Sequence, residues 1–326
     1  MMEKETVSLM FIVTLGCNSE CPHCCLSCGM GKKDICLTGE EMVRYIEKVH
    51  NSKYQVDSVI FSGGEATLYQ EEICLPMTVA STLGLHVDLR TNAYWATSQM
   101  KAYEVLKGYK DRGLQQLGLS YDWYHCRVPV EYIQNAIKAS RELELRLYVD
   151  WIGKETHADV LEYMQLEESE LRAVIPPLRV GKATLLSDSH FELYPREYYK
   201  GSASCKGEHK ILTIFPGGYA SLHPCCWVNP ALIRKIGNNG WLNELDKEME
   251  NSQMVQYLYE QGVGGLIEKA EREQPQLLKT HYSYQCEACY DLLGALFPDE
   301  IQDVPEYIKE LKEPKNRRKE KALVMV

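Results

Sequence analysis

Hydrophobic residues in the first two-thirds of the chain form short β-branched runs, which alternate with segments whose apolar residues recur at helical spacing. The runs predict strands at residues 7–14, 56–62, 86–91, 117–120, 145–152 and 177–180. Helical spacing predicts helices at 98–107, 130–141 and 157–167, and a capping box, Thr38-Gly39-Glu40-Glu41, begins another. This alternation is typical of parallel strands joined by crossover helices. Six such units are too few to close an eight-stranded barrel, so we expect an α/β protein with a partial (β/α)6 TIM barrel and ligands at the C-terminal strand ends.

The pattern changes after about residue 185. Two short strands are expected at 210–215 and 219–223, around the hairpin turn signal Pro216-Gly217-Gly218. Cysteines flank this hairpin and return beyond a later helical stretch, at Cys205, Cys225, Cys226, Cys286 and Cys289. We therefore predict a barrel over residues 1–195, a smaller metal-binding domain over 196–300 and a solvated basic tail over 301–326.

Composition excludes several classes of protein. The net charge of −10 argues against nucleic acid as a partner, because phosphate binding needs a positive surface. No apolar stretch approaches the roughly 20 residues that cross a bilayer, and the N-terminal residues lack the cleavage pattern of an export signal. We expect a cytoplasmic protein without membrane insertion. Thirteen closely spaced cysteines in such a protein favour metal ligation over disulfides.

The densest cysteine motif follows the first predicted strand, with the spacing Cys17-x3-Cys21-x2-Cys24. Three thiolates from one loop leave one iron of a [4Fe–4S] cluster without a protein ligand. This motif resembles the radical S-adenosylmethionine (SAM) superfamily, in which the open iron chelates the methionyl group of the cofactor. The resemblance implies that S-adenosyl-L-methionine binds at this loop. The other reading of the motif is a zinc site made by Cys17, Cys21, Cys24 and Cys28.

Further motifs at the predicted strand ends match the superfamily in order. Phe61-Ser62-Gly63-Gly64-Glu65 resembles the glycine-rich stretch that holds the cofactor's ammonium group, and glycine permits close approach of the backbone. Thr91-Asn92-Ala93, Ser120-Tyr121-Asp122 and Val180-Gly181-Lys182-Ala183 end later strands, and His23 occupies the aromatic position near adenine. The resemblance implies these cofactor-binding residues: Gly63, Gly64, Glu65, Asn92, Ser120, Asp122 and Gly181. A zinc site would leave Glu65 and Asn92 unexplained.

The second group of cysteines supplies four thiolates, Cys205, Cys225, Cys286 and Cys289, which are enough to close a second [4Fe–4S] cluster. This group resembles the twitch domain, a short relative of the SPASM domain, and implies a twitch-like iron–sulfur domain with two clusters in the whole chain. A structural zinc site is the alternative. Adjacent residues of an extended chain point to opposite sides, so Cys226 is expected to remain free when Cys225 is a ligand.

A narrower resemblance is to radical peptide epimerases, which invert residues of ribosomally synthesised peptides. It rests on the cysteine motif, Thr91-Asn92-Ala93-Tyr94-Trp95, the stretch from Ser120 to His125, and Pro224-Cys225-Cys226. The resemblance implies that a Cα hydrogen atom is removed and that Cys226 is the catalytic residue returning hydrogen from the opposite face. It also implies two partners, a ribosomally synthesised precursor peptide and an electron donor of the flavodoxin or ferredoxin type.

Two other functions remain open on the sequence alone. The same initiation chemistry can end in a thioether or carbon–carbon crosslink of a peptide. A non-catalytic cysteine-rich metal or redox-sensing protein is the alternative from another class. The sequence assigns no role to Cys25, Cys28, Glu208 or His209.

Overall fold

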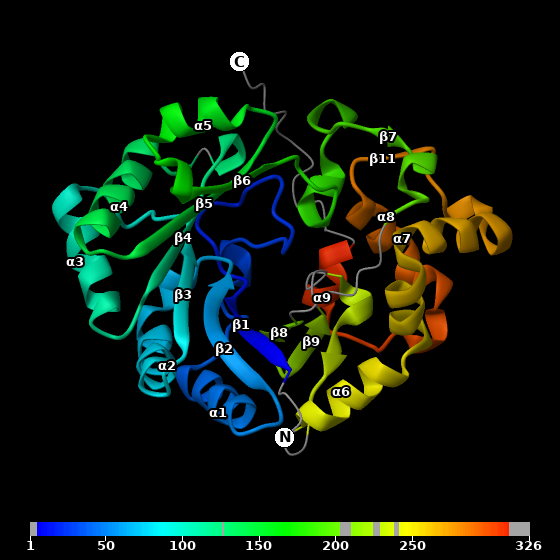
Figure 1. Ribbon diagram of the computed structural model, residues 1–326, viewed down its shortest axis with the longest axis horizontal. Coiled ribbons are helices and arrows are strands. Elements are labelled where there is room, and N and C mark those ends of the chain that lie inside the picture. The colour runs from blue at the N-terminus through cyan, green and yellow to red at the C-terminus, as the bar shows by residue number, and fades with distance from the viewer. Residues whose placement is uncertain (1–4, 126, 203–209, 224–228, 238–240, 313–326) are drawn as a thin grey trace.

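The computed structural model describes residues 5–125, 127–202, 210–223, 229–237 and 241–312. Its central element is one nine-stranded sheet in the order β10-β9-β8-β1-β2-β3-β4-β5-β6 (Figure 1). The six barrel strands are β1 (Thr6–Thr14), β2 (Gln55–Gly63), β3 (His86–Thr91), β4 (Gln116–Ser120), β5 (Arg146–Ile152) and β6 (Leu171–Ile175). Each pairs in parallel with the next, which confirms the predicted α/β fold and its partial barrel.

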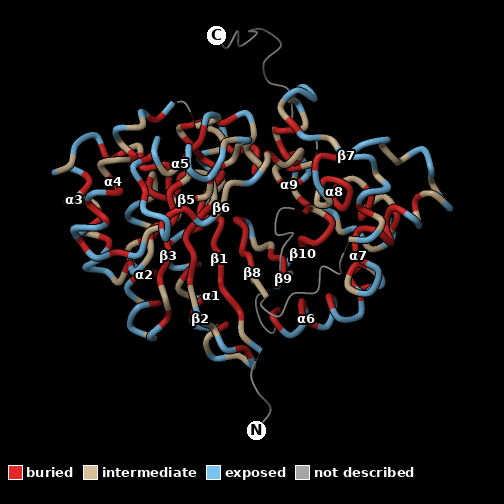
Figure 2. The backbone as a smooth tube through the Cα atoms, turned by 45° about the horizontal axis from the view of Figure 1, so that its top comes forward, coloured by how far each residue is buried: buried red, intermediate tan, exposed pale blue. Residues whose placement is uncertain are grey.

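Helices cover the outside of this barrel (Figure 1). They are α1 (Gly39–His50), α2 (Gln70–Thr82), α3 (Gln99–Lys110), α4 (Val130–Glu142) and α5 (His157–Met164). The predicted capping box begins α1: the Thr38 side chain accepts from the Glu41 N–H, and the Glu41 carboxylate accepts from the Thr38 N–H. The sequence analysis missed α2, which contains Pro76. Figure 2 shows the sheet buried between these helices and the rest of the chain.

The sixth strand lies earlier than predicted. The structure places β6 at Leu171–Ile175, whereas the prediction was 177–180. Pro176 and Pro177 follow β6 directly, and proline has no N–H with which to continue a strand ladder. The segment from Leu178 to Val180 instead leads into a 3-10 turn at Gly181–Leu185.

The predicted hairpin is confirmed as β8 (Lys210–Phe215) and β9 (Tyr219–His223), and β10 (Arg234–Lys235) follows it. It joins the barrel sheet, because β8 pairs in parallel with β1 over Val7 to Phe11. The helices that follow it are α6 (Trp241–Asn251), α7 (Gln253–Glu273), α8 (Gln285–Leu296) and α9 (Glu306–Lys312). A small two-stranded sheet joins β7 (Tyr194–Pro195) to β11 (His281–Tyr282).

The described part of the expected solvated tail, residues 301–312, contains a packed helix. Residues Glu306–Lys312 form a helix, α9, in which Ile308 and Leu311 are buried. Apolar residues three apart lie on one face of a helix, and here this face packs beside the first cysteine motif. Glu310 also pairs with Lys32 at 2.7 Å. Residues 313–326, which hold the rest of the basic run, lie outside the described residues.

In the described part of the chain, every helix is too short or too polar to span a membrane.

Candidate active site

A cavity of about 380 Å³ lies at the C-terminal ends of the barrel strands. One side of its wall is the cysteine loop, which we define as residues 15–29. The rest of the described wall is formed by the ends of β2, β3, β4 and β5, by residues between Ile175 and Val180, by Asn229 and by α8. The cavity therefore lies where partial barrels bind their ligands, between the barrel and the C-terminal third of the chain.

The three cysteines of the predicted cluster motif all line this cavity. The loop is turned so that the Cys24 N–H donates to the Cys21 carbonyl at 3.2 Å. Backbone N–H groups also point at two of the sulfurs, because Ser19 donates to Cys17 Sγ and Cys28 donates to Cys24 Sγ, each at 3.4 Å. Such donors stabilise thiolates and orient them for metal binding. The arrangement fits an iron–sulfur cluster held by Cys17, Cys21 and Cys24.

The three thiols differ in their readiness to ionise. A hydrogen bond from the Cys28 side chain is the main reason why the pKa of Cys24 lies well below its usual value, and it outweighs burial. Burial raises the pKa of Cys17 to about 12. The thiolate is the metal-binding form, so Cys17 releases its proton only when a metal replaces it.

The glycine turn at the end of β2 packs directly on the start of the cysteine loop. A Cβ atom added to Gly64 would lie 2.0 Å from the Gly16 carbonyl oxygen, and one on Gly63 would lie 2.6 Å from that of Thr14. Gly63 also has a φ of 126°, which favours glycine. Both glycines line the cavity. Because these glycines have no side chains, the turn can pack against the cysteine loop and leave room for a ligand.

Glu65 and Asn92 tie two strand ends to this loop. The buried Glu65 carboxylate accepts from Thr91 Oγ1 and from the Asn92 N–H, both at 2.8 Å. Burial raises the pKa of Glu65, although these hydrogen bonds oppose the shift. The Asn92 amide then donates to Ser19 Oγ at 2.8 Å. Both predicted residues line the cavity and belong to one hydrogen-bonded network.

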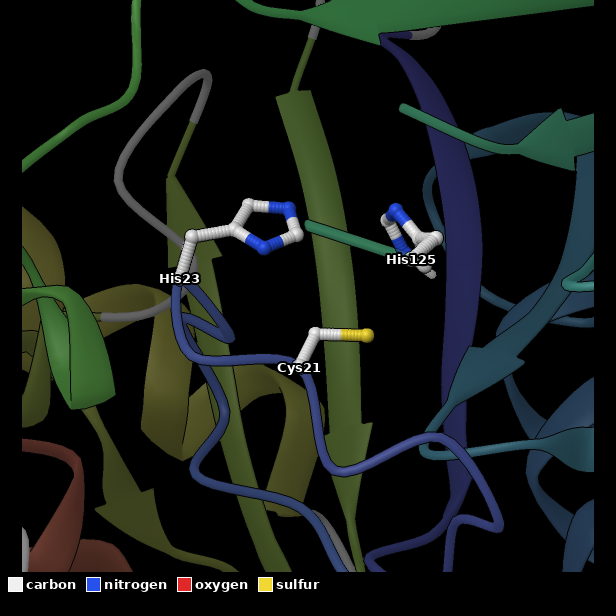
Figure 3. Close-up of side chains that lie close together, drawn as sticks. All are labelled: Cys21, His23 and His125. Carbon is white, nitrogen blue, oxygen red and sulfur yellow. The ribbon is translucent and has the colours of Figure 1, made fainter. Parts of the chain in front are cut away.

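Asp122 is buried and faces two imidazole rings. Its carboxylate lies 3.0 Å from His125 Nδ1 and 3.4 Å from His23 Nε2. Burial alone would raise the pKa of Asp122, but the two rings outweigh it and lower the pKa well below its usual range. Figure 3 shows both rings and the Cys21 sulfur around one space, and their ligand atoms lie within 4.8 Å of one another. Ser120, the remaining predicted residue of β4, also lines the cavity.

Gly181 packs against the backbone of the cysteine loop. Its φ is 58°, and an added Cβ would lie 2.5 Å from the Cys25 carbonyl oxygen and 2.6 Å from that of Cys24. The next residue, Lys182, donates its N–H to the Cys24 carbonyl at 3.0 Å. Val180, the residue before Gly181, lines the cavity, whereas Gly181 is absent from the described wall. A contact between this turn and adenine stays a prediction.

Only part of the second cysteine group can be placed. Cys286 and Cys289 lie one turn apart on α8, and Cys286 lines the same cavity as the cysteine loop. Cys289 is buried, with the Asn229 amide 3.7 Å from its sulfur. The other predicted ligands and the predicted donor, Cys205, Cys225 and Cys226, lie outside the described residues, as do Glu208 and His209. The second cluster therefore stays a prediction.

The sequence analysis missed several residues of the cavity wall, among them Arg90, Asp150, Asn229 and Tyr290. A signal for two of them was present. Parallel strands buried on both faces are usually apolar throughout, whereas β3 carries Asp88 and Arg90 and β5 carries Asp150. Charged residues at alternate positions of such strands indicate a polar barrel interior.

The comparisons with known proteins agree with this geometry. Residues 11–166 match the family model described as the Radical SAM superfamily. No curated protein matches the chain. A solved structure described as native anSMEcpe with bound AdoMet has a TM-score of 0.51 and 15% sequence identity, over 91% of this chain and 98% of that chain. At this identity the likeness shows the fold alone, and it extends over the C-terminal third as well as the barrel.

Proposed function

We propose, from the radical SAM superfamily domain of residues 11–166, that this chain is a radical SAM enzyme that epimerises residues of a ribosomally synthesised peptide. The observation that carries the proposal is the convergence of Cys17, Cys21 and Cys24 with Glu65 and Asn92 on one cavity. When bound there, a [4Fe–4S] cluster with S-adenosyl-L-methionine supplies hydrogen-atom abstraction.

The chain's own residues divide this task. Cys17, Cys21 and Cys24 hold the cluster, and Glu65 offers its buried carboxylate to the methionyl ammonium group. Asn92 holds the cysteine loop against the strand ends through its hydrogen bond to Ser19. The walls around them exclude water, which protects a reactive carbon-centred species. A flavodoxin or ferredoxin is the proposed source of electrons.

Inversion at Cα needs a hydrogen donor on the face opposite to the abstraction. The proposed donor is Cys226. One observation supports this choice: Asn229, three residues further along the chain, lines the cavity on the side of the C-terminal third. The aromatic residues Tyr94, Trp95, Trp123 and Tyr124 are absent from the described cavity wall.

The test is incubation of the reconstituted enzyme with its precursor peptide in deuterium oxide. We expect a gain of about 1 Da per inverted residue, with one deuterium at Cα, because a thiol exchanges its proton with solvent. Cys226→Ala should lose this product but still form 5′-deoxyadenosine. Cys74→Ala is the matched control, since Cys74 lies on α2 outside the described cavity wall. A loss of about 2 Da would instead identify crosslinking or dehydrogenation.

One observation favours a second candidate, a metal-binding protein without catalysis. Cys21, His23 and His125 offer three ligand atoms within 4.8 Å of one another, and thiolate with imidazole is a ligand set that zinc prefers. Metal analysis of the purified protein separates the two. Iron and sulfide support the enzyme, and stoichiometric zinc that iron cannot replace supports the alternative.

A further inference from the structure

Arg90 brings a positive charge into the interior of the barrel. It lies on β3, two residues before Asn92, and both residues line the cavity. Among the described residues of the cavity wall, Arg90 is the only lysine or arginine. Within the described wall, an anion that enters this cavity therefore meets this guanidinium as the one permanently charged cation.

The guanidinium of Arg90 has no hydrogen-bond or ion-pair partner among the described residues, and its Nε is buried. Two acidic side chains of the barrel strands are already bonded to other residues. Asp150 accepts from Arg172 Nε at 2.7 Å, and Asp88 accepts from the Tyr148 hydroxyl at 3.2 Å. Arg90 interacts with Asp88 only at longer range, where it opposes the rise that burial gives to the pKa of Asp88.

An unpaired cation in a partly buried position is unfavourable, and proteins normally pair such a group. The other buried or half-buried arginines in the described part of the chain follow this rule: Arg179 pairs with Asp188, Arg196 with Glu271, and Arg234 with Glu248. Arg90 departs from it at the wall of a cavity. The missing partner is therefore expected to arrive with a ligand.

The shape of the guanidinium defines the chemistry of that partner. Its planar fork of N–H donors matches the two oxygens of a carboxylate, and such pairs are among the strongest hydrogen bonds in proteins. We propose that Arg90 is the carboxylate-binding residue of the cavity. Two ligands could supply this carboxylate: the methionyl group of the cofactor and the peptide substrate. Both follow from the proposed function, on which this inference rests.

The first experiment measures binding to the iron–sulfur-reconstituted protein by equilibrium dialysis. The probes are S-adenosylmethionine and its decarboxylated analogue. If the cofactor supplies the carboxylate, Arg90→Met should reduce the preference for S-adenosylmethionine over the analogue roughly 10- to 100-fold. Arg90→Lys should recover part of it, because lysine keeps the charge but loses the fork. Arg112→Met, which removes an exposed arginine on the surface, should leave the preference unchanged.

The second arm uses N-acetylglutamate as a probe for a peptide carboxylate, with binding detected by saturation-transfer NMR. Saturable binding to the wild type that Arg90→Met abolishes, with an unchanged cofactor preference, would assign the carboxylate to the peptide. Unchanged behaviour of Arg90→Met with both probes would overturn the proposal. If the wild type binds neither cofactor form, the proposed function fails, and the N-acetylglutamate arm alone decides the role of Arg90.

A purely structural role makes different predictions. Loss of an unpaired cation should leave the midpoint of thermal unfolding of the ligand-free protein unchanged or higher in Arg90→Met. Arg172→Met should lower it, because this change leaves Asp150 without its partner. An equal decrease in both variants would show that Arg90 acts in folding and would contradict the proposal. A changed reduction potential of the cluster in Arg90→Met, with unchanged affinity for all probes, would also contradict the proposal.

Discussion

Replacement of Gly181 by alanine tests how the cysteine loop is held. The new methyl group would lie 2.5 and 2.6 Å from the carbonyl oxygens of Cys25 and Cys24, about 1 Å inside normal contact. The loop must therefore move, and with it a predicted cluster ligand. The positive φ of 58° adds strain that glycine does not have.

The matched control is Gly84→Ala. Gly84 has a φ of 75°, but nothing lies within 4 Å of its added Cβ. We expect Gly84→Ala to cost about 1 kcal/mol of unfolding free energy from backbone strain alone. Gly181→Ala should cost about 2–4 kcal/mol, because overpacking adds about 1–3 kcal/mol.

The assay for this pair is urea unfolding of the metal-free proteins, followed by iron titration of each. Gly181→Ala should also weaken iron binding roughly 10-fold or more, as expected when a group that orients a ligand is displaced. Gly84→Ala should bind iron like the wild type. Equal unfolding costs for the two variants, with full iron binding by both, would refute the role given to Gly181.

Three further predictions concern the same loop. Asn92→Ala should lower the unfolding free energy by about 1–2 kcal/mol and slow cluster reconstitution, measured by absorbance, because it detaches the loop from β3; reconstitution at the wild-type rate would argue against this link. Lys32→Met should cost about 1–3 kcal/mol and expose α9 to limited proteolysis, since it breaks the pair with Glu310, whereas Lys101→Met on the exposed surface of α3 should do neither. Burial raises the pKa of Cys17 from 9.0 to about 12, so the unfolded chain ionises first and the metal-free protein should lose stability between pH 9 and 12. Urea unfolding of the wild type and of Cys17→Ser at several pH values checks this. The variant should lose less unfolding free energy over this pH range, and the same pH dependence in both proteins would contradict the assignment.

Much of the barrel was predictable because local patterns dominate it. Apolar runs bounded by turn residues gave five of its strands, and the Thr38 capping box gave the start of α1. The sixth strand was misplaced because the apolar residues after Pro177 resemble a strand, while backbone pairing stops at the two prolines.

The pairing of β8 with β1 could not be predicted, since parallel pairing between strands some 200 residues apart leaves no local pattern. The packing of α9 was missed for a related reason. Charged residues surround Ile308 and Leu311 in the sequence, and their burial depends on a loop near the other end of the chain.

The residues of the site also fall into those that local sequence patterns predict and those that depend on the fold. Spacing predicted Cys17, Cys21 and Cys24 as ligands, and strand-end motifs predicted Glu65 and Asn92, and all five residues line one cavity. Sequence could not show that Arg90 lacks a partner, because a charge is unpaired only with respect to neighbours that the fold supplies.

The most direct test of the central claim is the formation of 5′-deoxyadenosine from S-adenosylmethionine by the reconstituted, chemically reduced protein. The wild type and Cys74→Ala should form it, and Cys21→Ala should not, because two thiolates are too few to hold the cluster. Formation at the wild-type rate by Cys21→Ala, or none by the fully iron-loaded wild type, would contradict the claim.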